Sequence, residues 1–205
     1  MDIRSYALGP LMTNGFLVRN GPEALFIDPG GDPALVLEDI RKQGLSLKQI
    51  VITHLHCDHI YGAAAMAKAT GAPVLAHPKD EFLLGTEVGG GGLMGLPLVD
   101  DFPYGPLQPG SARFLGLEVE VLHTPGHSPG SVSLYFREQG VVFVGDLLFK
   151  RSVGRTDFHG GSTATLMDSV RDKIFTLPPE TVVYSGHGPE TTVGDERLHN
   201  PFFQE

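Results

Sequence analysis

The amino-acid sequence predicts a chain of the α/β class, and three observations lead to this prediction. Short apolar runs that end at Gly, Pro or Asp recur along the chain, as is typical of strands. Helix-like segments with capping residues lie between several of these runs. Strands follow one another directly in other stretches, such as residues 117–144, so we expect sheets covered by helices.

Each predicted element is bounded by its own start or stop residues. The predicted strands are residues 15–19, 24–27, 49–53, 73–76, 117–122, 132–136, 141–144 and 181–184. The predicted helices are residues 33–43, 62–69 and 163–175, with a short final helix after residue 193 that ends before Asn200. Asp32 and Ser162 precede two of these helices, where their side-chain oxygens can accept hydrogen bonds from the first turn. Gly44 and Gly71 end two of them, because glycine readily adopts the left-handed conformation common after a helix.

Length and composition limit the class of protein. The 205 residues predict a single domain, residues 1–205, that buries roughly 70% of the surface of the unfolded chain. A formal charge of −9 with scattered basic residues argues against binding to nucleic acid or to a membrane surface. We expect a cytoplasmic protein, because the sequence has no apolar signal segment, no membrane-length apolar run and one cysteine, Cys57. The sequence does not predict the oligomeric state.

Residues 85–110 differ from the rest of the chain. They contain four consecutive glycines at positions 89–92 and four prolines, and they have no usable periodicity. We expect a long surface loop here, and loops of this length are more often functional or mobile than structural.

A strand-like run at residues 49–53 leads directly into four candidate metal ligands in the pattern H-x-H-x-D-H. The His and Asp frequencies of this chain give such a string by chance about once in a thousand sequences. Alternate residues of an extended segment share a face, so His54, His56 and Asp58 point one way and Cys57 the other. His59 joins the ligands only if the backbone turns after Asp58. We predict a metal site on this loop and a free, buried thiol at Cys57.

Three further candidate ligands follow strand-like runs and lie beside glycines, which let the backbone approach an ion closely. They are His127, Asp146 and His187. The combined set of five His and two Asp is too large for one tetrahedral zinc ion. Two metal ions that share a carboxylate use all seven.

These motifs resemble the metallo-β-lactamase superfamily of hydrolases, and within it the short single-domain hydrolases similar to glyoxalase II. The resemblance extends through residues 14–16, 27–30, 53–59, 124–131, 145–146, 154–158 and 186–190. It implies an αββα sandwich in which two mixed sheets pack face to face with helices outside. It also implies a division of the ligands into His54, His56 and His127 for one metal ion, Asp58, His59 and His187 for the second, and Asp146 as the bridge.

The resemblance implies a hydrolase that uses two divalent metal ions, with zinc expected first and iron or manganese also suitable. Two such ions lower the pKa of a bridging water from near 16 toward 7 and polarise the carbonyl that the resulting hydroxide attacks. Asp58 and Asp146 are then catalytic through the metals. Small thioesters such as S-lactoylglutathione suit this chemistry, because a thiol with a pKa near 8.5 can leave as thiolate without a general acid.

The chain departs from glyoxalase II in two respects. The tail after His187 is too short for the C-terminal helical region that helps the longer enzymes to bind glutathione, so we predict no such domain. The Lys and Tyr that contact substrate in those enzymes are matched here by Arg155 and Asp157. Arg155 is a candidate for binding a substrate carboxylate, and an ion pair with Asp157 is its alternative role.

The remaining candidates receive plainer roles. Asp28 ends a strand, where it is either a turn residue or a carboxylate that orients a ligating histidine. Residues 150–151 are expected to be solvated. We expect exposed or capping roles for His77, His159 and His199, and either a supporting role near the metals or plain packing for His123.

Three other functions remain open. Persulfide dioxygenases share the H-x-H-x-D-H string and hold one iron ion with the equivalents of His54, His127 and Asp146. A lactone or β-lactam hydrolase would keep all the ligands and place its specificity in residues 85–110. The non-catalytic alternative is a structural metal site, in which protein ligands close every coordination position. In each catalytic case the partner is a small-molecule substrate.

Overall fold

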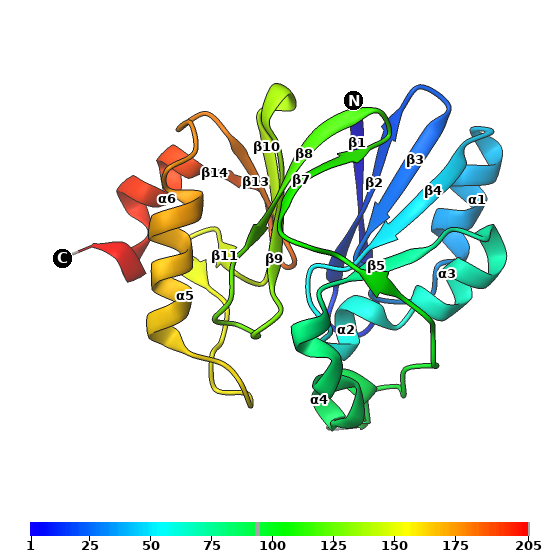
Figure 1. The fold of residues 1–205 in the computed structure, drawn as a ribbon, viewed down its shortest axis with the longest axis horizontal. Coiled ribbons are helices and arrows are strands. Elements are labelled where there is room, and N and C mark those ends of the chain that lie inside the picture. The colour runs from blue at the N-terminus through cyan, green and yellow to red at the C-terminus, as the bar shows by residue number, and fades with distance from the viewer. Residues whose placement is uncertain (93–94, 205) are drawn as a thin grey trace. The chain divides into compact units, whose positions relative to one another are not determined.

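The structure is a computed structural model that describes residues 1–92 and 95–204. The chain forms two compact units, of which the first contains Met1–Leu107 and Phe114–Gly116 and the second contains Gln108–Arg113 and Leu117–Glu205. Each unit has one large sheet and its own helices (Figure 1). The single-domain organisation stays a prediction.

The first unit is built on a mixed sheet in the order β1-β2-β3-β4-β5-β6. Its strands are β1 (Asp2–Leu8), β2 (Thr13–Asn20), β3 (Glu23–Ile27), β4 (Ser46–Val51), β5 (Val74–Ala76) and β6 (Gly105–Pro106). Strands β1 to β3 pair antiparallel, whereas β3 to β6 pair parallel. The parallel part places the carboxyl ends of β3 and β4 at one edge, where the polar segments follow.

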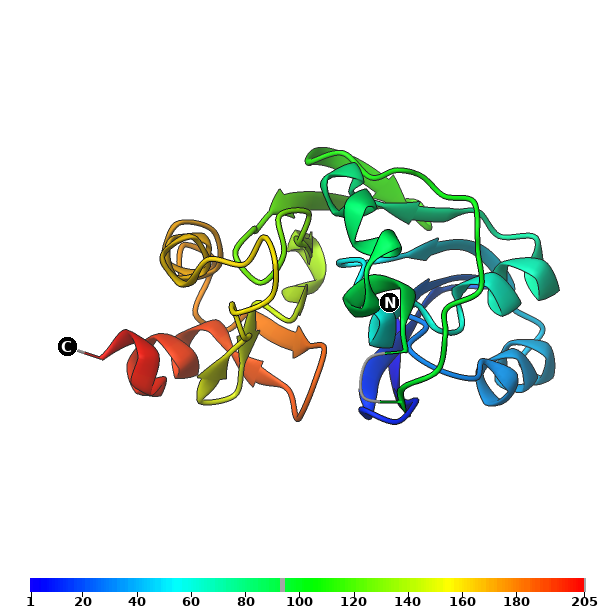
Figure 2. The same ribbon diagram turned by 90° about the horizontal axis from the view of Figure 1, so that it is seen from below.

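Helices and helical turns of the first unit fill the connections between its parallel strands. They are α1 (Ala34–Lys42), α2 (Cys57–Ile60), α3 (Ala63–Thr70), the 3₁₀ segment η1 (Pro78–Gly85) and α4 (Glu87–Gly90). Helices α1 and α3 lie on the same face of the sheet (Figures 1 and 2). Val36 of α1 and Met66 of α3 are fully buried in one core with Phe26 and Ile50 of the strands, so burial of apolar side chains holds these layers together.

The second unit is built on a mixed sheet in the order β14-β13-β10-β9-β8-β7. Its strands are β7 (Gly110–Phe114), β8 (Leu117–His123), β9 (Val132–Phe136), β10 (Val141–Gly145), β13 (Val182–Ser185) and β14 (Thr191–Thr192), with a small hairpin of β11 (Leu148–Phe149) and β12 (Ser152–Val153). Strands β10 and β13 pair parallel, and β9 pairs antiparallel with β10 and β8.

The helical segments of the second unit are α5 (Thr163–Ser169), the π-helical segment η4 (Val170–Ile174), α6 (Val193–His199) and the 3₁₀ turns η3 (Arg137–Gln139) and η5 (Pro201–Phe203). Helices α5 and α6 lie on one face of their sheet (Figure 1). Leu166, Val170 and Val193 are fully buried against Val142 and Val183 of the sheet.

The sequence-based elements agree with the structure in position more than in length. Each predicted strand overlaps a strand, and each predicted helix overlaps a helix. Ser162 is confirmed as an N-cap, because it accepts a hydrogen bond from the Thr165 N–H. Asp32 lies one residue before Pro33, the N-cap of α1, and accepts a hydrogen bond from the Ala34 N–H at 3.0 Å. Strand β1 was not predicted, because it is an edge strand whose side chains are largely exposed and lack an apolar run.

The prediction of a long loop was wrong for only part of residues 85–110, because residues 99–104 form no helix or strand, whereas short elements lie elsewhere in this range. It contains the end of η1, then α4, β6 and the start of β7, while residues 93–94 lie outside the described residues. Glycine has a low helix propensity, so the α4 segment shows no helical signal in the sequence. The helix forms nevertheless, and the Thr86 side chain caps it by accepting a hydrogen bond from the Gly89 N–H.

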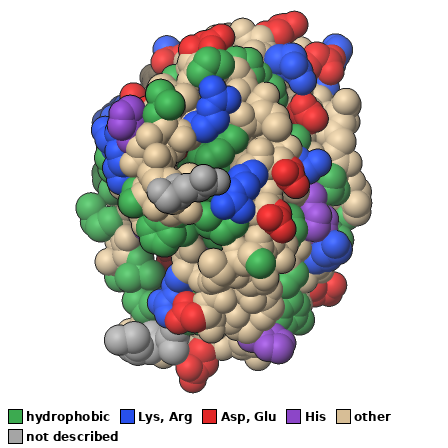
Figure 3. Space-filling model, turned by 90° about the vertical axis from the view of Figure 1, so that its left-hand side faces the viewer, with side chains coloured by type: hydrophobic (Ala, Val, Ile, Leu, Met, Phe, Trp, Pro, Cys, Tyr) green, Lys and Arg blue, Asp and Glu red, His purple; other side chains and the backbone are tan. Residues whose placement is uncertain are grey.

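Charges of both signs are interspersed on the face of the molecule shown in Figure 3. Several basic side chains of the protein are paired with acids, among them Arg151 with Asp195. Among the described residues, no helix is long and apolar enough to span a membrane. A cytoplasmic location stays a prediction.

Candidate metal centre

Four predicted ligands of the first unit lie together after β4. The backbone leaves the strand at Val51 and begins helix α2 at Cys57, so it turns before Asp58 rather than after it, and this turn brings His59 to the other ligands. The ring centroid of His54 lies 4.6 Å from the ring centroid of His56 and 4.1 Å from that of His59. Asp58 Oδ2 lies 3.6 Å from His59 Nε2, and all four side chains are buried.

Asp28, at the end of β3, orients two of these histidines. Its carboxylate accepts hydrogen bonds from Thr53 N–H and Thr53 Oγ1, both at 2.7 Å, and from His59 Nδ1 at 2.9 Å. Thr53 Oγ1 in turn lies 3.1 Å from His54 Nδ1. Asp28 is fully buried and has a φ of +53°, a conformation that costs energy in a non-glycine residue. The predicted role of Asp28 as an orienting carboxylate is therefore present in the geometry.

Other residues fix the position of Asp58. Thr13 Oγ1 donates a hydrogen bond to Asp58 Oδ2 at 2.7 Å. A Cβ atom on Gly30 would lie 2.1 Å from the Asp58 carbonyl oxygen, so the chain needs glycine where this turn meets the ligand loop. The Asp28-Pro29-Gly30 turn thus contacts the ligand loop through a side chain and through its backbone.

We expect Asp28→Asn to weaken zinc binding by about 10- to 100-fold, the usual cost of losing a residue that orients a ligand. The amide must turn an N–H₂ group toward one of the three donors that Asp28 accepts, which misorients His54 or His59. Zinc affinity measured by competition with a chromophoric chelator checks this.

Asp32→Asn is the matched control for Asp28→Asn, because Asp32 is exposed and asparagine caps a helix equally well. Wild-type zinc affinity in Asp28→Asn would contradict the orienting role.

Three predicted ligands of the second unit also lie together. Asp146 and His187 follow β10 and β13, which are parallel neighbours whose carboxyl ends meet at one edge, and His127 follows β8. Asp146 Oδ2 lies 3.5 Å from His187 Nε2 and 3.7 Å from His127 Nε2. His127 Nδ1 donates to the Arg155 carbonyl at 2.7 Å, which fixes the ring and leaves Nε2 facing the carboxylate.

The donor atoms in both units fit a metal ion. Separations of 3.5 to 3.7 Å between carboxylate oxygen and imidazole nitrogen exceed hydrogen-bond length. They are close to the edge of about 3.4 Å of a tetrahedron with metal–ligand bonds of about 2.0–2.1 Å. Nitrogen and oxygen donors without thiolate suit zinc, iron or manganese.

Cys57 is the free, buried thiol that the sequence predicts. Tyr61 Oη donates a hydrogen bond to its Sγ at 3.3 Å. Burial raises the pKa of the Cys57 thiol, which keeps it protonated near neutral pH.

Arg155 forms the ion pair that was its alternative role. Its Nε and Nη2 donate to the two carboxylate oxygens of Asp157, both at 2.7 Å, and its guanidinium lies 3.9 Å from the ring centroid of Phe158. The exposed Asp157 and the half-buried Phe158 thus hold this side chain in one orientation, and the Arg155 carbonyl already orients His127. Arg155 therefore supports a ligand whether or not it touches substrate.

We expect Asp157 to titrate near pH 2, because hydrogen bonds from Arg155 lower its pKa to about 2. A lowered pKa means that the ion pair contributes to stability above about pH 4 and that this contribution is lost as the pH falls toward 2. Arg155→Ala should return the pKa to the usual value near 3.9, which an NMR titration of the carboxyl carbons measures. An Asp157 that titrates near pH 4 in the unmodified chain would contradict the pairing.

One other sequence-based assignment changed. Arg151, expected to be solvated, donates from Nη1 to Glu196 Oε1 at 2.7 Å and from Nη2 to Asp195. The expected capping role of His77 is confirmed, because it is the N-cap of η1 and its Nδ1 accepts a hydrogen bond from the Lys79 N–H at 3.3 Å, although the side chain is buried. No local sequence pattern indicates the Arg151 pairing, because its partners lie more than 40 residues away.

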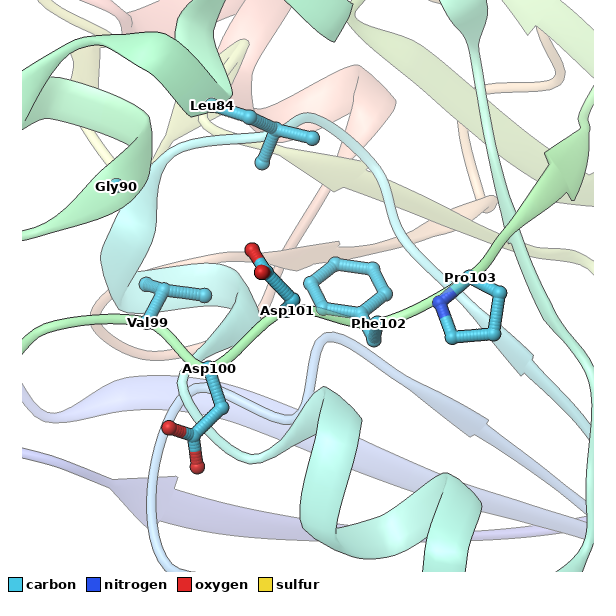
Figure 4. Close-up of a pocket in the computed structure, with 7 residues that line it drawn as sticks. All are labelled: Leu84, Gly90, Val99, Asp100, Asp101, Phe102 and Pro103. Atoms are coloured by element: carbon cyan, nitrogen blue, oxygen red, sulfur yellow. The ribbon is translucent and has the colours of Figure 1, made fainter.

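Two surface cavities of the first unit border residues 99–103. The smaller, of about 300 Å³, is lined by Leu84, Gly90, Val99, Asp100, Asp101, Phe102 and Pro103 (Figure 4). The larger, of about 730 Å³, lies between the same segment and α3. Neither lining includes a predicted metal ligand, so these cavities are separate from the ligand groups.

The chain matches the model of the metallo-β-lactamase superfamily over residues 8–187. It belongs to the metallo-β-lactamase superfamily. It is 37% identical to "Probable metallo-hydrolase YqgX" of Bacillus subtilis, over 98% of this chain and 97% of that protein. It is also 37% identical to "Hydroxyacylglutathione hydrolase GloC" of Haemophilus influenzae, over 87% of this chain and 86% of that protein.

Solved structures are similar over nearly the whole chain. The BLEG-1 B3 metallo-β-lactamase has a TM-score of 0.94 and 39% identity, and the likeness covers 100% of both chains. TTHA1623 in a di-iron-bound form has a TM-score of 0.87 and 41% identity, over 97% of this chain and 99% of that one. ETHE1 from Myxococcus xanthus has a TM-score of 0.76 and 31% identity, over 98% of this chain and 84% of that one.

These likenesses confirm the predicted family and fold class, an α/β sandwich of mixed sheets with helices. The protein is therefore a metallohydrolase of this superfamily, and its clustered histidine and aspartate side chains suit divalent metal ions.

Proposed function

We propose that this metallohydrolase holds two divalent metal ions, zinc first among them, and hydrolyses small thioesters such as S-lactoylglutathione. The observation that carries the proposal is that all seven predicted ligands fall into two groups, four in the first unit and three in the second. Carboxylate oxygens and imidazole nitrogens lie 3.5 to 3.7 Å apart in both groups, and the His54 ring lies 4.1 to 4.6 Å from those of His59 and His56. In the proposal, His54, His56 and His127 would hold one metal ion, Asp58, His59 and His187 would hold the other, and Asp146 would contribute to both.

The residues of the chain prepare this site in defined ways. Asp28 and the Arg155 carbonyl accept the Nδ1 protons of His59 and His127, so the Nε2 lone pairs of both rings stay available as ligands. Asp146 and Asp58 supply negative charge that offsets the charge of two cations. When bound, the two ions supply hydroxide at neutral pH and polarise the substrate carbonyl. No nucleophilic side chain is then required.

The thioester preference is supported by chemistry and by one relative. A thiolate with a conjugate-acid pKa near 8.5 departs without a general acid, whereas an amide needs a proton donor. The Haemophilus influenzae relative is named a hydroxyacylglutathione hydrolase. The likeness to BLEG-1, named a B3 metallo-β-lactamase, favours β-lactam hydrolysis as the second candidate.

Arg155 is the proposed contact for an anionic group of the substrate. Its side chain is 57% exposed, and a substrate carboxylate could exchange with Asp157 for the same two donors. Arg155→Lys would then raise KM more than it lowers kcat, because a lysine cannot make the bidentate contact.

The test combines elemental analysis of metals per chain in the purified protein with hydrolysis of S-lactoylglutathione, read by thiol release. Close to two metals with turnover supports the proposal, especially if a chelator abolishes turnover and added zinc restores it. Two metals with turnover of a chromogenic β-lactam but not of the thioester overturns the substrate class. One iron per chain with persulfide-dependent oxygen uptake overturns the hydrolase and supports the dioxygenase alternative.

A further inference from the structure

The helical segment after β5 holds the backbone between two of the predicted metal ligands. This segment, residues 78–90, consists of η1 and α4, and we call it the brace. We propose that Asp80 of the brace is a positioning residue for the metal-binding loop, because it fixes Leu55 and with it the spacing of His54 and His56. The inference rests on the proposed metal site, and it concerns a contact that the ligand pattern does not predict.

Asp80 reaches the loop through its side chain. Its carboxylate accepts a hydrogen bond from the Leu55 N–H, with Oδ2 3.2 Å from the nitrogen. Both residues have no exposed surface, so this contact lies in a water-excluded setting. A hydrogen bond to a charged acceptor is worth more than a neutral one, and a buried N–H that loses its acceptor is costly.

Gly89 holds the other side of Leu55. A Cβ atom added to Gly89 would lie 2.9 Å from the Leu55 carbonyl oxygen and 2.4 Å from that of Leu83. The first turn of α4 therefore packs directly on the ligand loop, with no room for a side chain. The brace therefore contacts the Leu55 backbone on both sides: Asp80 accepts a hydrogen bond from the N–H, and Gly89 packs against the carbonyl oxygen.

Hydrogen bonds and a buried side chain hold the brace in place, as a segment that positions another loop requires. The His77 carbonyl accepts a hydrogen bond from the Asp80 N–H at 3.3 Å, and Leu83 is buried in the first unit. Thr86 Oγ1 donates to the Leu83 carbonyl at 2.7 Å, and the Thr86 carbonyl accepts from the Gly90 N–H at 2.6 Å. These bonds connect η1 to α4, so Asp80 and Gly89 are held in one frame.

Leu55 is the single residue between two ligands, so its backbone decides how their rings are placed. The two rings meet edge to face with centroids 4.6 Å apart, a geometry that leaves both side chains directed to one region. If the Leu55 peptide rotates, His54 and His56 lose their common orientation, and metal affinity falls before the fold is lost.

The test compares Asp80→Ala with Asp80→Asn, whose amide oxygen can still accept from Leu55. Glu81→Ala is the matched control, because it removes the adjacent carboxylate, which is exposed. A second pair compares Gly89→Ala with Gly85→Ala, since a Cβ on Gly85 meets no atom within 4 Å. Two readouts apply to the full chain: exchange of the Leu55 amide proton by NMR, with and without zinc, and zinc affinity by chelator competition.

We expect Asp80→Ala and Gly89→Ala to weaken zinc binding by about 10- to 100-fold, with Leu55 exchange at least about tenfold faster. Asp80→Asn should restore most of both properties, and the Glu81 and Gly85 variants should match the unmodified chain. Equal zinc affinity in Asp80→Ala and the unmodified chain overturns the positioning role, as does a loss in Asp80→Ala without faster Leu55 exchange. If the unmodified chain binds no zinc, the proposed function fails, and normal zinc binding with an unresponsive Leu55 defeats the positioning role alone.

Discussion

Asp146→Asn should reduce the metal content from about two ions per chain to one or fewer and lower thioester turnover by more than about 100-fold. The carboxylate is the only ligand of the second group that carries a negative charge, and its Oδ2 lies 3.5 Å from His187 Nε2 and 3.7 Å from His127 Nε2. An amide nearly conserves the shape but removes the charge that two cations would share. Elemental analysis and thiol release measured on one preparation check both effects.

The matched control for Asp146→Asn is Asp168→Asn, which makes the same chemical change on the exposed surface of α5. It should retain full metal content and full turnover. Full occupancy together with full activity in Asp146→Asn would defeat the bridging assignment. A loss of metal accompanied by a lower melting temperature of the metal-free chain would instead indicate a folding defect, so the unfolding of both variants is measured without metal.

The ligands could be predicted from sequence because the information is local. His54, His56, Asp58 and His59 form one dense motif, and His127 and the other second-unit ligands each follow a strand-like run that ends beside glycine. Parallel strands present their carboxyl ends at one edge, so β10 and β13 bring their ligands together without any further signal. The division between two ions came from the family resemblance, because spacing alone does not assign ligands to ions.

The roles of Asp80 and Arg151, unlike that of Asp28, could not be predicted in this way. Asp80 reaches Leu55 across 25 positions of sequence, and Arg151 reaches Glu196 across 45. Nothing near either residue distinguishes a carboxylate that holds a backbone N–H from one that faces water. The α4 segment was missed for a related reason, because its glycines carry a low helix propensity while packing on Leu55 requires one of them.

Removal of the Glu196 side chain has the largest expected effect on stability. Glu196 is fully buried in the second unit, where its carboxylate accepts from Arg151 N–H at 2.8 Å and from Arg151 Nη1 at 2.7 Å. It also accepts from Thr191 Oγ1 at 2.6 Å and from Asn200 Nδ2 at 2.9 Å. Glu196→Ala removes the acceptor that these donors share, and a buried donor left unsatisfied costs about 1–3 kcal/mol, so we expect a total loss of about 3–5 kcal/mol. For a chain of this length the melting temperature should fall by roughly 10 °C.

Asp195→Ala is the control, because it removes the other partner of Arg151, whose carboxylate is half-buried whereas that of Glu196 is fully buried. A surface ion pair contributes little, so the free energy of unfolding should change by less than about 1 kcal/mol. Equal stability of the Asp195→Ala and Glu196→Ala chains would show that the buried carboxylate has no special role.

The Glu196 network also joins the fold to the metal ligands of the second unit. It holds Arg151 at a φ of +62° in the turn of the β11–β12 hairpin, and Asn200 donates to the Ser152 carbonyl of the same hairpin at 3.0 Å. Phe149 of that hairpin packs edge to face against His187, with ring centroids 6.0 Å apart. Glu196→Ala should therefore weaken zinc binding even at temperatures where the chain stays folded. Chelator competition well below the melting transition measures this, and an unchanged affinity would limit the network to a role in stability.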